Sequence, residues 1–282
     1  MKPTIVDPIN VALREDIGDG DVTTDFFVAK NQRGMARVVA RERAILAGTD
    51  TAAEVFRRVD PVVEIAVVRK DGSEINPDES VIEIRGPARS ILKAERVALN
   101  FLQRLSGIAT MTRKFVDAAS NEHVKILDTR KTTPGLRALE KAAVVAGGGA
   151  NHRFGLFDMV LLKDNHLAVT TGFDAFAKAV RKFHETRPNV QIEVEADSLE
   201  QVRTFLEIDG IDMILLDNMK PAQIREAIAL GKGKVKFEAS GGVTLKNIRQ
   251  IAATGVDFIS IGALTHSPHA VDFSLELTPI VP

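Results

Sequence analysis

Cysteine, tryptophan and tyrosine are all absent from the 282-residue chain. Without cysteine there is no disulfide, no thiolate metal site and no thiol nucleophile, so any chemistry must come from serine, lysine, histidine and carboxylate side chains. The absence also fits a reducing compartment, and we expect a cytoplasmic protein.

An excess of charge of either sign is absent as well, because 37 basic residues stand against 38 acidic ones and the formal net charge is -1. No global basic field would draw nucleic acid or an anionic membrane, so any preference for anions must be local. No run approaches the ~20 apolar residues of a membrane helix, and the opening segment MKPTIVDPINVALRED lacks the apolar core of an export signal. We expect a soluble, unexported protein.

The first part of the chain, up to about Gly86, predicts a small mixed sheet with helices. Short runs rich in valine and isoleucine predict strands, and longer stretches with helical spacing of apolar residues predict helices. Ser90 is a candidate N-cap, and Gly107 separates the last two helices. The predicted strands are Met35–Ala40, Val62–Val68 and Val81–Ile84, and the predicted helices are Thr51–Arg58, Ser90–Leu105 and Met111–Ala119.

From Val124 onward, short apolar runs alternate with helical segments. Such alternation predicts parallel strands joined by right-handed crossovers, which both a barrel and a doubly wound sheet satisfy. Each run ends at a polar, charged or glycine residue or, in one case, directly before Ser240, and a ring of such residues at the carboxyl ends of the strands favours the barrel. The predicted strands are Val124–Asp128, Met159–Lys163, Gln191–Glu195, Met213–Asp217, Val235–Ala239 and Phe258–Gly262.

The tail Val271–Leu277 alternates apolar and polar residues, which predicts a half-buried antiparallel strand that joins the N-terminal sheet. We therefore expect two domains: residues 1–108 together with 270–282, and a catalytic domain over residues 109–269.

A glycine pair after the fifth predicted strand of the second part indicates a phosphate site. Ser240, Gly241 and Gly242 precede a predicted helix over Thr244–Ala253, so backbone N–H groups and a helix start would face an anion. The small-residue loop from Gly262 to His266 follows the last strand. Barrels commonly bind phosphate with the loops after their final two strands, so the two signals support each other.

Cations gather around the first two predicted strands of the second part. Arginine matches a carboxylate or phosphate with two parallel hydrogen bonds, and lysine adds a compact charge. Together they predict a site for a substrate with two or three negative charges. The glycine run 147–149 is expected to end the preceding helix and to let the chain turn inward. The cations are Arg130, Lys131, His152, Arg153 and Lys163.

Two carboxylates, Glu195 and Asp217, end neighbouring units of the predicted barrel. Beside a phosphorylated ligand they predict a Mg²⁺ site, since Mg²⁺ binds carboxylate and phosphate oxygens together. They would equally stabilise positive charge on a sugar carbon. The structural alternative is a pair of salt bridges to Lys163 and Lys131.

These motifs together resemble the quinolinate phosphoribosyltransferase family, which makes nicotinate mononucleotide in NAD synthesis. The resemblance implies an N-terminal α/β sandwich domain, an open α/β barrel of about six parallel strands, and a homodimer whose active sites lie between subunits. The matching segments are Glu15–Thr24, Ala94–Arg96, Leu105–Thr110, Asp128–Arg137, Gly148–Arg153, Leu162–His166, Leu215–Asn218 and Glu238–Gly242.

The resemblance also implies a role for each candidate residue. Quinolinate would be held by Arg96 of the partner subunit and by Thr129, Arg130, His152, Arg153 and Lys163. Phosphoribosyl pyrophosphate would be held by Lys131, Lys163, Ser240, Gly241, Gly242, Gly262 and His266. Lys131, Glu195 and Asp217 would be catalytic, and the two carboxylates would hold Mg²⁺.

The implied reaction is Mg²⁺-dependent phosphoribosyl transfer to quinolinate with decarboxylation. Three alternatives remain open at this point. One is a phosphosugar aldolase that uses Lys163 or Lys131 as a Schiff-base nucleophile, and another is a regulator that binds a phosphorylated metabolite without turnover. The third is a related transferase, such as a nicotinate-specific or molybdenum-operon relative.

Overall fold

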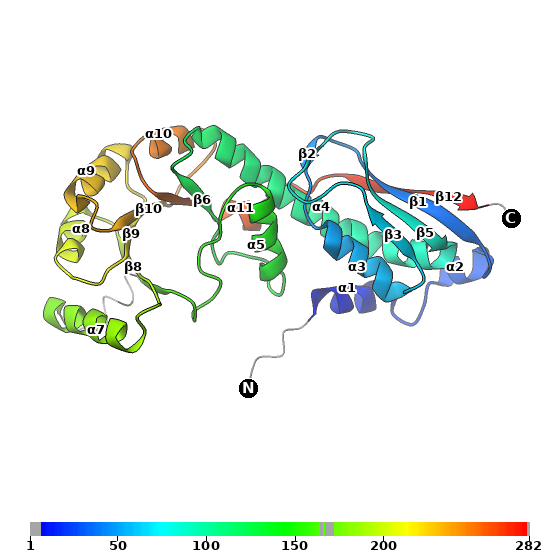
Figure 1. Cartoon of the computed structure of the whole chain (residues 1–282), viewed down its shortest axis with the longest axis horizontal. Coiled ribbons are helices and arrows are strands. Elements are labelled where there is room, and N and C mark those ends of the chain that lie inside the picture. Colours follow the sequence, from blue (N-terminus) through cyan, green and yellow to red (C-terminus); the bar gives the residue numbers. More distant parts are fainter. Residues whose placement is uncertain (1–6, 164–165, 167–171, 281–282) are drawn as a thin grey trace. The chain divides into compact units, whose positions relative to one another are not determined.

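The computed structural model (Figure 1) describes residues 7–163, 166 and 172–280. Asp164 and Asn165, which belong to one of the matching segments, lie outside the described residues, as does the start of the opening segment. Contacts divide the chain into two compact units: Met1–Arg113 with Thr132–Gly148 and Leu264–Pro282, and Lys114–Lys131 with Gly149–Ala263. None of the helices within the described residues has an apolar stretch long enough to cross a bilayer.

The first unit is built on a four-stranded antiparallel sheet in the order β12-β1-β5-β3. The central strands are β1 (Arg33–Ala40) and β5 (Ser80–Pro87), and the outer ones are β3 (Glu64–Val67) and β12 (Phe273–Ile280). The C-terminal β12 pairs with β1 along the whole strand, so segments far apart in the sequence lie side by side in one sheet. A second, two-stranded sheet pairs β2 (Ala44–Ile45) with β4 (Glu74–Ile75).

Helices pack on one face of this sheet because its strands alternate buried and exposed residues. Ala36 and Val38 of β1 share a core with Phe56 of α3 and with Leu99 and Leu102 of α4, and all five are at most 2% exposed. Five helices begin in this unit: α1 (Pro8–Ile17), α2 (Val22–Phe27), α3 (Thr49–Val59), α4 (Ala88–Ala119) and α5 (Arg137–Ala146). The last residues of α4 belong to the second unit.

The two helices predicted on either side of Gly107 are a single continuous helix, α4, and the predicted break is wrong. Gly107 is present for a different reason: a Cβ there would lie 2.1 Å from the carbonyl oxygen of His269. The helix continues through this position although glycine costs about 1 kcal/mol of helix propensity, and Ser106 and Ile108 on either side of it are fully buried. Ser90 is not the N-cap either, because α4 begins at Ala88; the Ser90 hydroxyl donates to Asp60 Oδ2 at 2.6 Å.

The second unit is a six-stranded parallel sheet in the order β6-β11-β10-β9-β8-β7. The strands at the two ends of this order, β6 and β7, follow each other in sequence, as they would in a barrel that is not closed. The strands are β6 (Lys125–Leu127), β7 (Val160–Leu162), β8 (Ile192–Ala196), β9 (Met213–Asp217), β10 (Lys236–Ser240) and β11 (Phe258–Ser260).

Figure 1 shows helices on the outside of these curved strands, which confirms the predicted open α/β barrel. All six predicted strands overlap an observed strand, because apolar runs bounded by turn residues are a strong signal for buried parallel strands. The helices are α7 (Phe173–Thr186), α8 (Leu199–Leu206), α9 (Pro221–Gly231) and α10 (Ile248–Ala252), and α11 (Ala263–His266) begins where this unit ends.

Candidate active site

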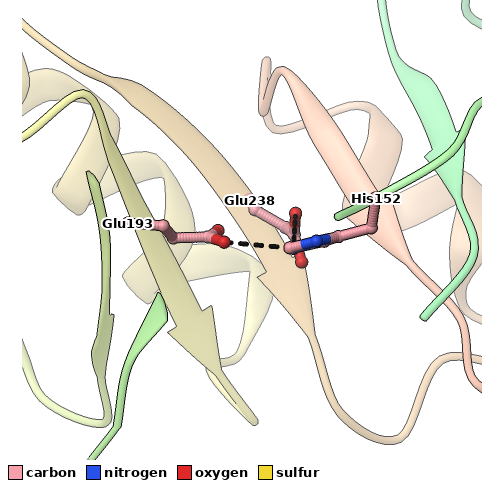
Figure 2. Close-up of side chains that lie close together, drawn as sticks. All are labelled: His152, Glu193 and Glu238. Carbon is pink, nitrogen blue, oxygen red and sulfur yellow. Dashed lines mark ion pairs between the residues drawn. The ribbon is translucent and has the colours of Figure 1, made fainter. Parts of the chain in front are cut away.

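Strand register brings polar side chains together inside the barrel. Residues in register on parallel strands share a face, and the face alternates along each strand. Asp217 is in register with Ser240, and Glu195 of β8 is in register with the residue two before Asp217. Glu193 of β8 and Glu238 of β10 each stand two residues before a strand-end residue and so share its face, and Figure 2 shows the two side chains converging on His152.

The outer layer of this face is a set of charged and hydroxyl groups at the strand ends. The Lys163 ammonium forms an ion pair with Glu195, whose side chain is 15% exposed. Asp217 Oδ2 accepts from the Asn218 amide at 2.9 Å. Ser240 Oγ accepts from the hydroxyl of Ser260 at 3.0 Å. The Lys163–Glu195 pair is one of the two salt bridges that the structural alternative predicts, so Glu195 has at least that role.

Two guanidinium groups lie near one another beside this layer. Thr129 and Arg130 are half-buried after β6, and Lys131 N–H donates to Thr129 Oγ1 at 3.0 Å in a tight turn. Arg153 donates from Nη1 to the carbonyl of Met159 at 3.4 Å. Burial and then the charge of Arg130 lower the pKa of Arg153. A bound anion would offset both effects, because it compensates like charges in a poorly hydrated place.

His152 lies between two fully buried carboxyl groups (Figure 2). Its Nε2 is 3.0 Å from Glu193 Oε2 and 3.4 Å from Glu238 Oε2, and its side chain is only 8% exposed. Burial raises the pKa of each glutamate to about 8, and the neighbouring Glu193 adds to the shift of Glu238. The pair therefore retains protons near neutral pH, as coupled carboxyl groups in a low-dielectric interior do.

The glycine loop after β10 differs from the prediction in one respect. Helix α10 begins at Ile248 rather than at Thr244. The Asn247 side chain explains the delay: it accepts from Thr244 N–H at 2.7 Å and donates to the Gly242 carbonyl at 3.0 Å, a local turn that competes with the helix. The loop after β10 can therefore offer an anion its backbone N–H groups, but not the start of a helix.

Gly241 meets a strict steric requirement in this loop. Its φ is +88°, and a Cβ would lie 2.3 Å from Asn218 Oδ1. A larger residue would clash with the side chain that contacts Asp217, so the loop comes close to the carboxylate layer only because glycine stands there.

The remaining candidates are spread over both units. Gly262 follows β11 in the second unit. His266 ends α11, is exposed, and has Nδ1 at 2.6 Å from Ser267 Oγ. Arg96 is an exposed residue of α4, and both it and His266 belong to the first unit.

Comparison with known families gives matches that together span almost the whole chain. Residues 21–106 match the model of the quinolinate phosphoribosyl transferase N-terminal domain, and residues 108–276 match that of the C-terminal domain. The chain belongs to the quinolinate phosphoribosyl transferase family. Its members are pentosyltransferases, so the chain is an enzyme of that class.

Individual relatives support the family assignment. A Bacillus subtilis protein named probable nicotinate-nucleotide pyrophosphorylase [carboxylating] is 43% identical over 96% of this chain and 92% of its own length. The crystal structure of NadC from Streptococcus pyogenes superposes with a TM-score of 0.91 at 40% identity, covering 97% of this chain and 96% of that one. The nicotinate-nucleotide pyrophosphorylase of Francisella tularensis gives a TM-score of 0.88 at 40% identity, over 96% and 94% of the two chains.

Three residues of this family member were not singled out from the sequence as part of the site. They are Asp128, Glu193 and Glu238, each with an exposed fraction of 0%. A signal for the glutamates was present, since each stands two residues before a chosen strand-end residue and so shares its face. Asp128 was placed among the polar strand ends but was given no role, because its hydrogen bond from His152 N–H joins residues 24 apart in sequence.

Proposed function

We propose that this chain transfers the phosphoribosyl group of phosphoribosyl pyrophosphate to the ring nitrogen of quinolinate. After the transfer, one carboxylate of quinolinate is lost as CO₂. The products are therefore nicotinate mononucleotide, pyrophosphate and CO₂, and the enzyme serves NAD synthesis. The observation that carries the proposal is that two arginines, Arg130 and Arg153, lie near one another at the carboxyl end of a barrel of this family.

Quinolinate suits the two arginines because it carries two adjacent carboxylates. Each guanidinium offers a planar fork to one carboxylate, and two negative charges compensate two positive ones. A ligand with a single carboxylate would offer a planar acceptor to only one of the two half-buried arginines. The same argument favours quinolinate over nicotinate as the substrate.

Phosphoribosyl pyrophosphate would be bound by the loops that follow the last strands. Backbone N–H groups of Gly241 and Gly242, with the Ser240 hydroxyl, suit a phosphate, and the Gly262 loop adds small residues that permit close approach. His266 and Lys131 would add contacts to the phosphates. We propose Lys163 for both substrates, since its ammonium already lies at the carboxylate layer beside Glu195.

Glu195 and Asp217 fit a Mg²⁺ site completed by substrate phosphates. Both are strand-end carboxylates with partly accessible side chains, and Mg²⁺ in proteins is commonly held by one or two carboxylates together with phosphate oxygens. Bound there, the ion would neutralise charge on the pyrophosphate leaving group. The test is turnover in Glu195→Gln and Asp217→Asn: we expect kcat to fall by at least about 100-fold, whereas a change confined to the melting temperature would leave only the salt-bridge role.

The chain's own residues would supply positioning and charge. The arginines hold the quinolinate ring so that its nitrogen faces the C1 carbon of the ribose, which brings two anions together against their repulsion. The nitrogen forms the new bond as the C1–pyrophosphate bond breaks, and the carboxylates of Glu195 and Asp217 stabilise the positive charge that develops at C1. The carboxylate beside the quaternary nitrogen then leaves as CO₂, and the ring carbon that carried it keeps the electron pair of the broken bond and takes up a proton from water.

The proposal is tested with purified protein, phosphoribosyl pyrophosphate and Mg²⁺, with quinolinate or nicotinate added in parallel. We expect equal amounts of CO₂ and pyrophosphate from quinolinate and neither from nicotinate. Pyrophosphate from nicotinate without CO₂ would assign the chain to a neighbouring specificity instead. No product from either, with ligand-induced stabilisation, would assign it to a binding protein.

The aldolase alternative fits the site less well. A Schiff-base lysine attacks as a neutral amine, whereas Lys163 is in an ion pair with Glu195. Borohydride reduction in the presence of a phosphosugar should therefore leave the mass of the protein unchanged.

We propose further that the chain works as a homodimer in which Arg96 of one subunit reaches the quinolinate of the other. Arg96 is exposed on α4 in the first unit, while Arg130 and Arg153 belong to the second. A third arginine at the dicarboxylate is the role that the family resemblance implies for this residue.

A further inference from the structure

A buried ion pair that the candidate site does not include joins helix α4 to helix α5. Arg104 donates to Glu140 Oε1 from Nη2 at 2.9 Å and from Nε at 3.1 Å. The Glu140 side chain is fully buried, and that of Arg104 is 31% exposed. The other carboxylate oxygen, Oε2, accepts from the backbone N–H of Thr133 at 3.1 Å. Both oxygens are therefore satisfied, as a charge needs when it is removed from water.

The same guanidinium bonds two segments that follow strands of the barrel. Arg104 Nη2 donates to Thr133 Oγ1 at 3.0 Å and to the backbone carbonyl of Thr265 at 2.6 Å. Thr133 lies between β6 and α5, and Thr265 lies in α11, which follows β11 (Figure 1). All of these residues, with Glu140, belong to the first unit. One arginine thus links the segment after β6 to the segment after β11, and Glu140 keeps that arginine in place.

Both linked segments carry residues that we propose for the phosphates of phosphoribosyl pyrophosphate. Lys131 stands two residues before Thr133, and His266 directly follows Thr265. Each lies within a few residues of a point where the chain passes from the second unit into the first. The backbone beside each of these side chains is therefore held by the Arg104 guanidinium.

The quinolinate residues are held in a different way. Thr129 and Arg130 follow β6 directly, and Thr129 Oγ1 accepts from Lys131 N–H in a turn of its own. Arg153 donates to the carbonyl of Met159 within its own segment, before β7. Loss of the ion pair is therefore expected to disturb the phosphate contacts more than the quinolinate contacts.

We propose that the Arg104–Glu140 pair is a positioning device for phosphoribosyl pyrophosphate, because it bonds the two segments that carry its phosphate contacts. The contacts concerned are Lys131 and His266. The proposal deepens the proposed function and rests on it. A buried ion pair adds little net stability compared with apolar side chains of similar size, but its directional bonds fix geometry. That geometry matters for transfer, since a displacement of about 1 Å in a substrate-holding group costs a large factor in rate.

Two substitutions at Thr133 test the proposal with little change to the fold. Thr133→Val keeps the branched shape and the backbone N–H to Glu140 but removes the hydroxyl that accepts from Arg104, whereas Thr133→Ser keeps a hydroxyl. With saturating quinolinate, we expect Thr133→Val to raise the KM of phosphoribosyl pyrophosphate about tenfold, because a segment that is no longer held must be ordered on binding. Thr133→Ser should stay within about twofold. The KM of quinolinate should stay within about threefold in both.

A change in the ion pair itself should act more strongly in the same direction. Arg104→Lys keeps the charge but not the planar fork, and we expect the KM of phosphoribosyl pyrophosphate to rise at least about 30-fold. Glu226→Gln is the matched control, because it removes one partner of the exposed pair with Arg203, and both KM values should be unchanged.

Melting temperatures are measured for every variant. A lower melting temperature with both KM values unchanged would show that the Arg104–Glu140 pair is only structural. An equal rise in the two KM values would show that it supports the site as a whole. Either result would overturn the proposal.

Double-mutant cycles show through which residues the pair acts. Combined with His266→Ala, Arg104→Lys should raise the KM of phosphoribosyl pyrophosphate by less than the product of the single effects, because one of the positioned groups is already absent. Combined with Arg130→Ala, whose proposed partner is quinolinate, the single effects should multiply. Full multiplication in both cycles would contradict the proposal.

Binding is also measured without turnover. The rise in melting temperature on adding phosphoribosyl pyrophosphate and Mg²⁺ reports binding alone, and it should be smaller for Thr133→Val and Arg104→Lys than for Thr133→Ser and the unaltered protein. Equal rises in all four proteins would overturn the proposal. Failure of the proposed function is told apart because it would appear as absent turnover of quinolinate in the unaltered enzyme.

Discussion

At the residue scale, charge inside the barrel is arranged so that a dicarboxylate ligand would relieve it. Arg130 lies close enough to lower the pKa of Arg153, and burial acts in the same direction. Deeper in the same face, Glu193 and Glu238 carry a raised pKa because they are buried. Like-charged groups that lie close together in a buried place are typical of functional sites, where a bound substrate or a proton offsets their repulsion.

Removing one of the two arginines should separate binding from stability. In Arg130→Ala we expect the KM for quinolinate to rise at least about 30-fold, the equivalent of ~2 kcal/mol for lost charge-assisted hydrogen bonds. The melting temperature should change little, because a like charge beside Arg153 is removed. Arg130→Lys keeps the charge without the planar fork and should recover only part of the affinity. Unchanged kinetics with a lower melting temperature would show that Arg130 is structural.

The buried glutamates predict how stability depends on pH. The folded pKa of Glu238, about 8, exceeds the ordinary value of 4.5 that applies in the unfolded chain. Between these values the folded state holds a proton that the unfolded state has lost, so the free energy of unfolding falls as pH rises, by at most ~1.4 kcal/mol per pH unit and proton.

Glu238→Gln should flatten that dependence. Melting temperatures measured between pH 5.5 and 8.5 should decline for the unaltered protein and decline less for the variant. Glu122→Gln, at an exposed position, serves as the control and should follow the unaltered protein. Equal slopes for all three proteins would mean that Glu238 ionises normally in the fold.

At the element scale, α4 and the loop after β10 show how tertiary contacts override local signals. Gly107 would ordinarily weaken or end a helix, yet α4 runs through it; the residue is glycine because the backbone at His269 approaches too closely for any side chain. Thr244 would ordinarily begin a helix, yet Asn247 binds the backbone there and delays it.

Substitution at Gly107 tests this account of α4. Gly107→Ala improves helix propensity by about 1 kcal/mol, but its Cβ would lie 2.1 Å from the His269 carbonyl oxygen. We expect a net loss of about 1–3 kcal/mol in the free energy of unfolding, measured by urea denaturation. Asn100→Ala, at an exposed position of the same helix, should be neutral or slightly stabilising. A stabilised Gly107→Ala would mean that the close approach is absent.

At the scale of the whole molecule, the chain returns to its first sheet only at its end. β12 pairs with β1 after the six strands of the barrel have formed a separate unit. The candidate residues are divided between the units accordingly, since Arg96 and His266 belong to the first and the remaining ones to the second. In the proposed dimer, Arg96 of one subunit would serve the quinolinate site of the other, as the family resemblance implies.

Mixed dimers test the assembly directly. Arg96→Ala and Lys163→Ala should each be nearly inactive alone. If Arg96 serves the partner's site, a hybrid dimer of the two variants has one intact site, and random mixing should restore about a quarter of the normal activity. Preparations that remain inactive after unfolding and refolding together, while the unaltered enzyme recovers, would place Arg96 in its own subunit's site or outside any site.

Much of the fold follows from the sequence alone because its signals are local. The six parallel strands were predicted from apolar runs of the right length, and their polar ends marked one edge of the barrel. The family resemblance rests on short motifs in the same segments. Residue types with distinctive chemistry, such as Arg130, Arg153 and Glu195, could be chosen for the same reason.

Only the tertiary structure decided which groups are partners. The ring of His152 meets Glu193 and Glu238 from two different strands, and its backbone is bonded to Asp128. Gly107 is explained by a residue more than a hundred positions later in the chain, at His269. Such contacts join segments distant in sequence, and burial, which sets the pKa of the glutamates, depends on everything packed around them. Sequence determined the kinds of groups and the strands that carry them; their hydrogen-bond partners and protonation were decided by packing.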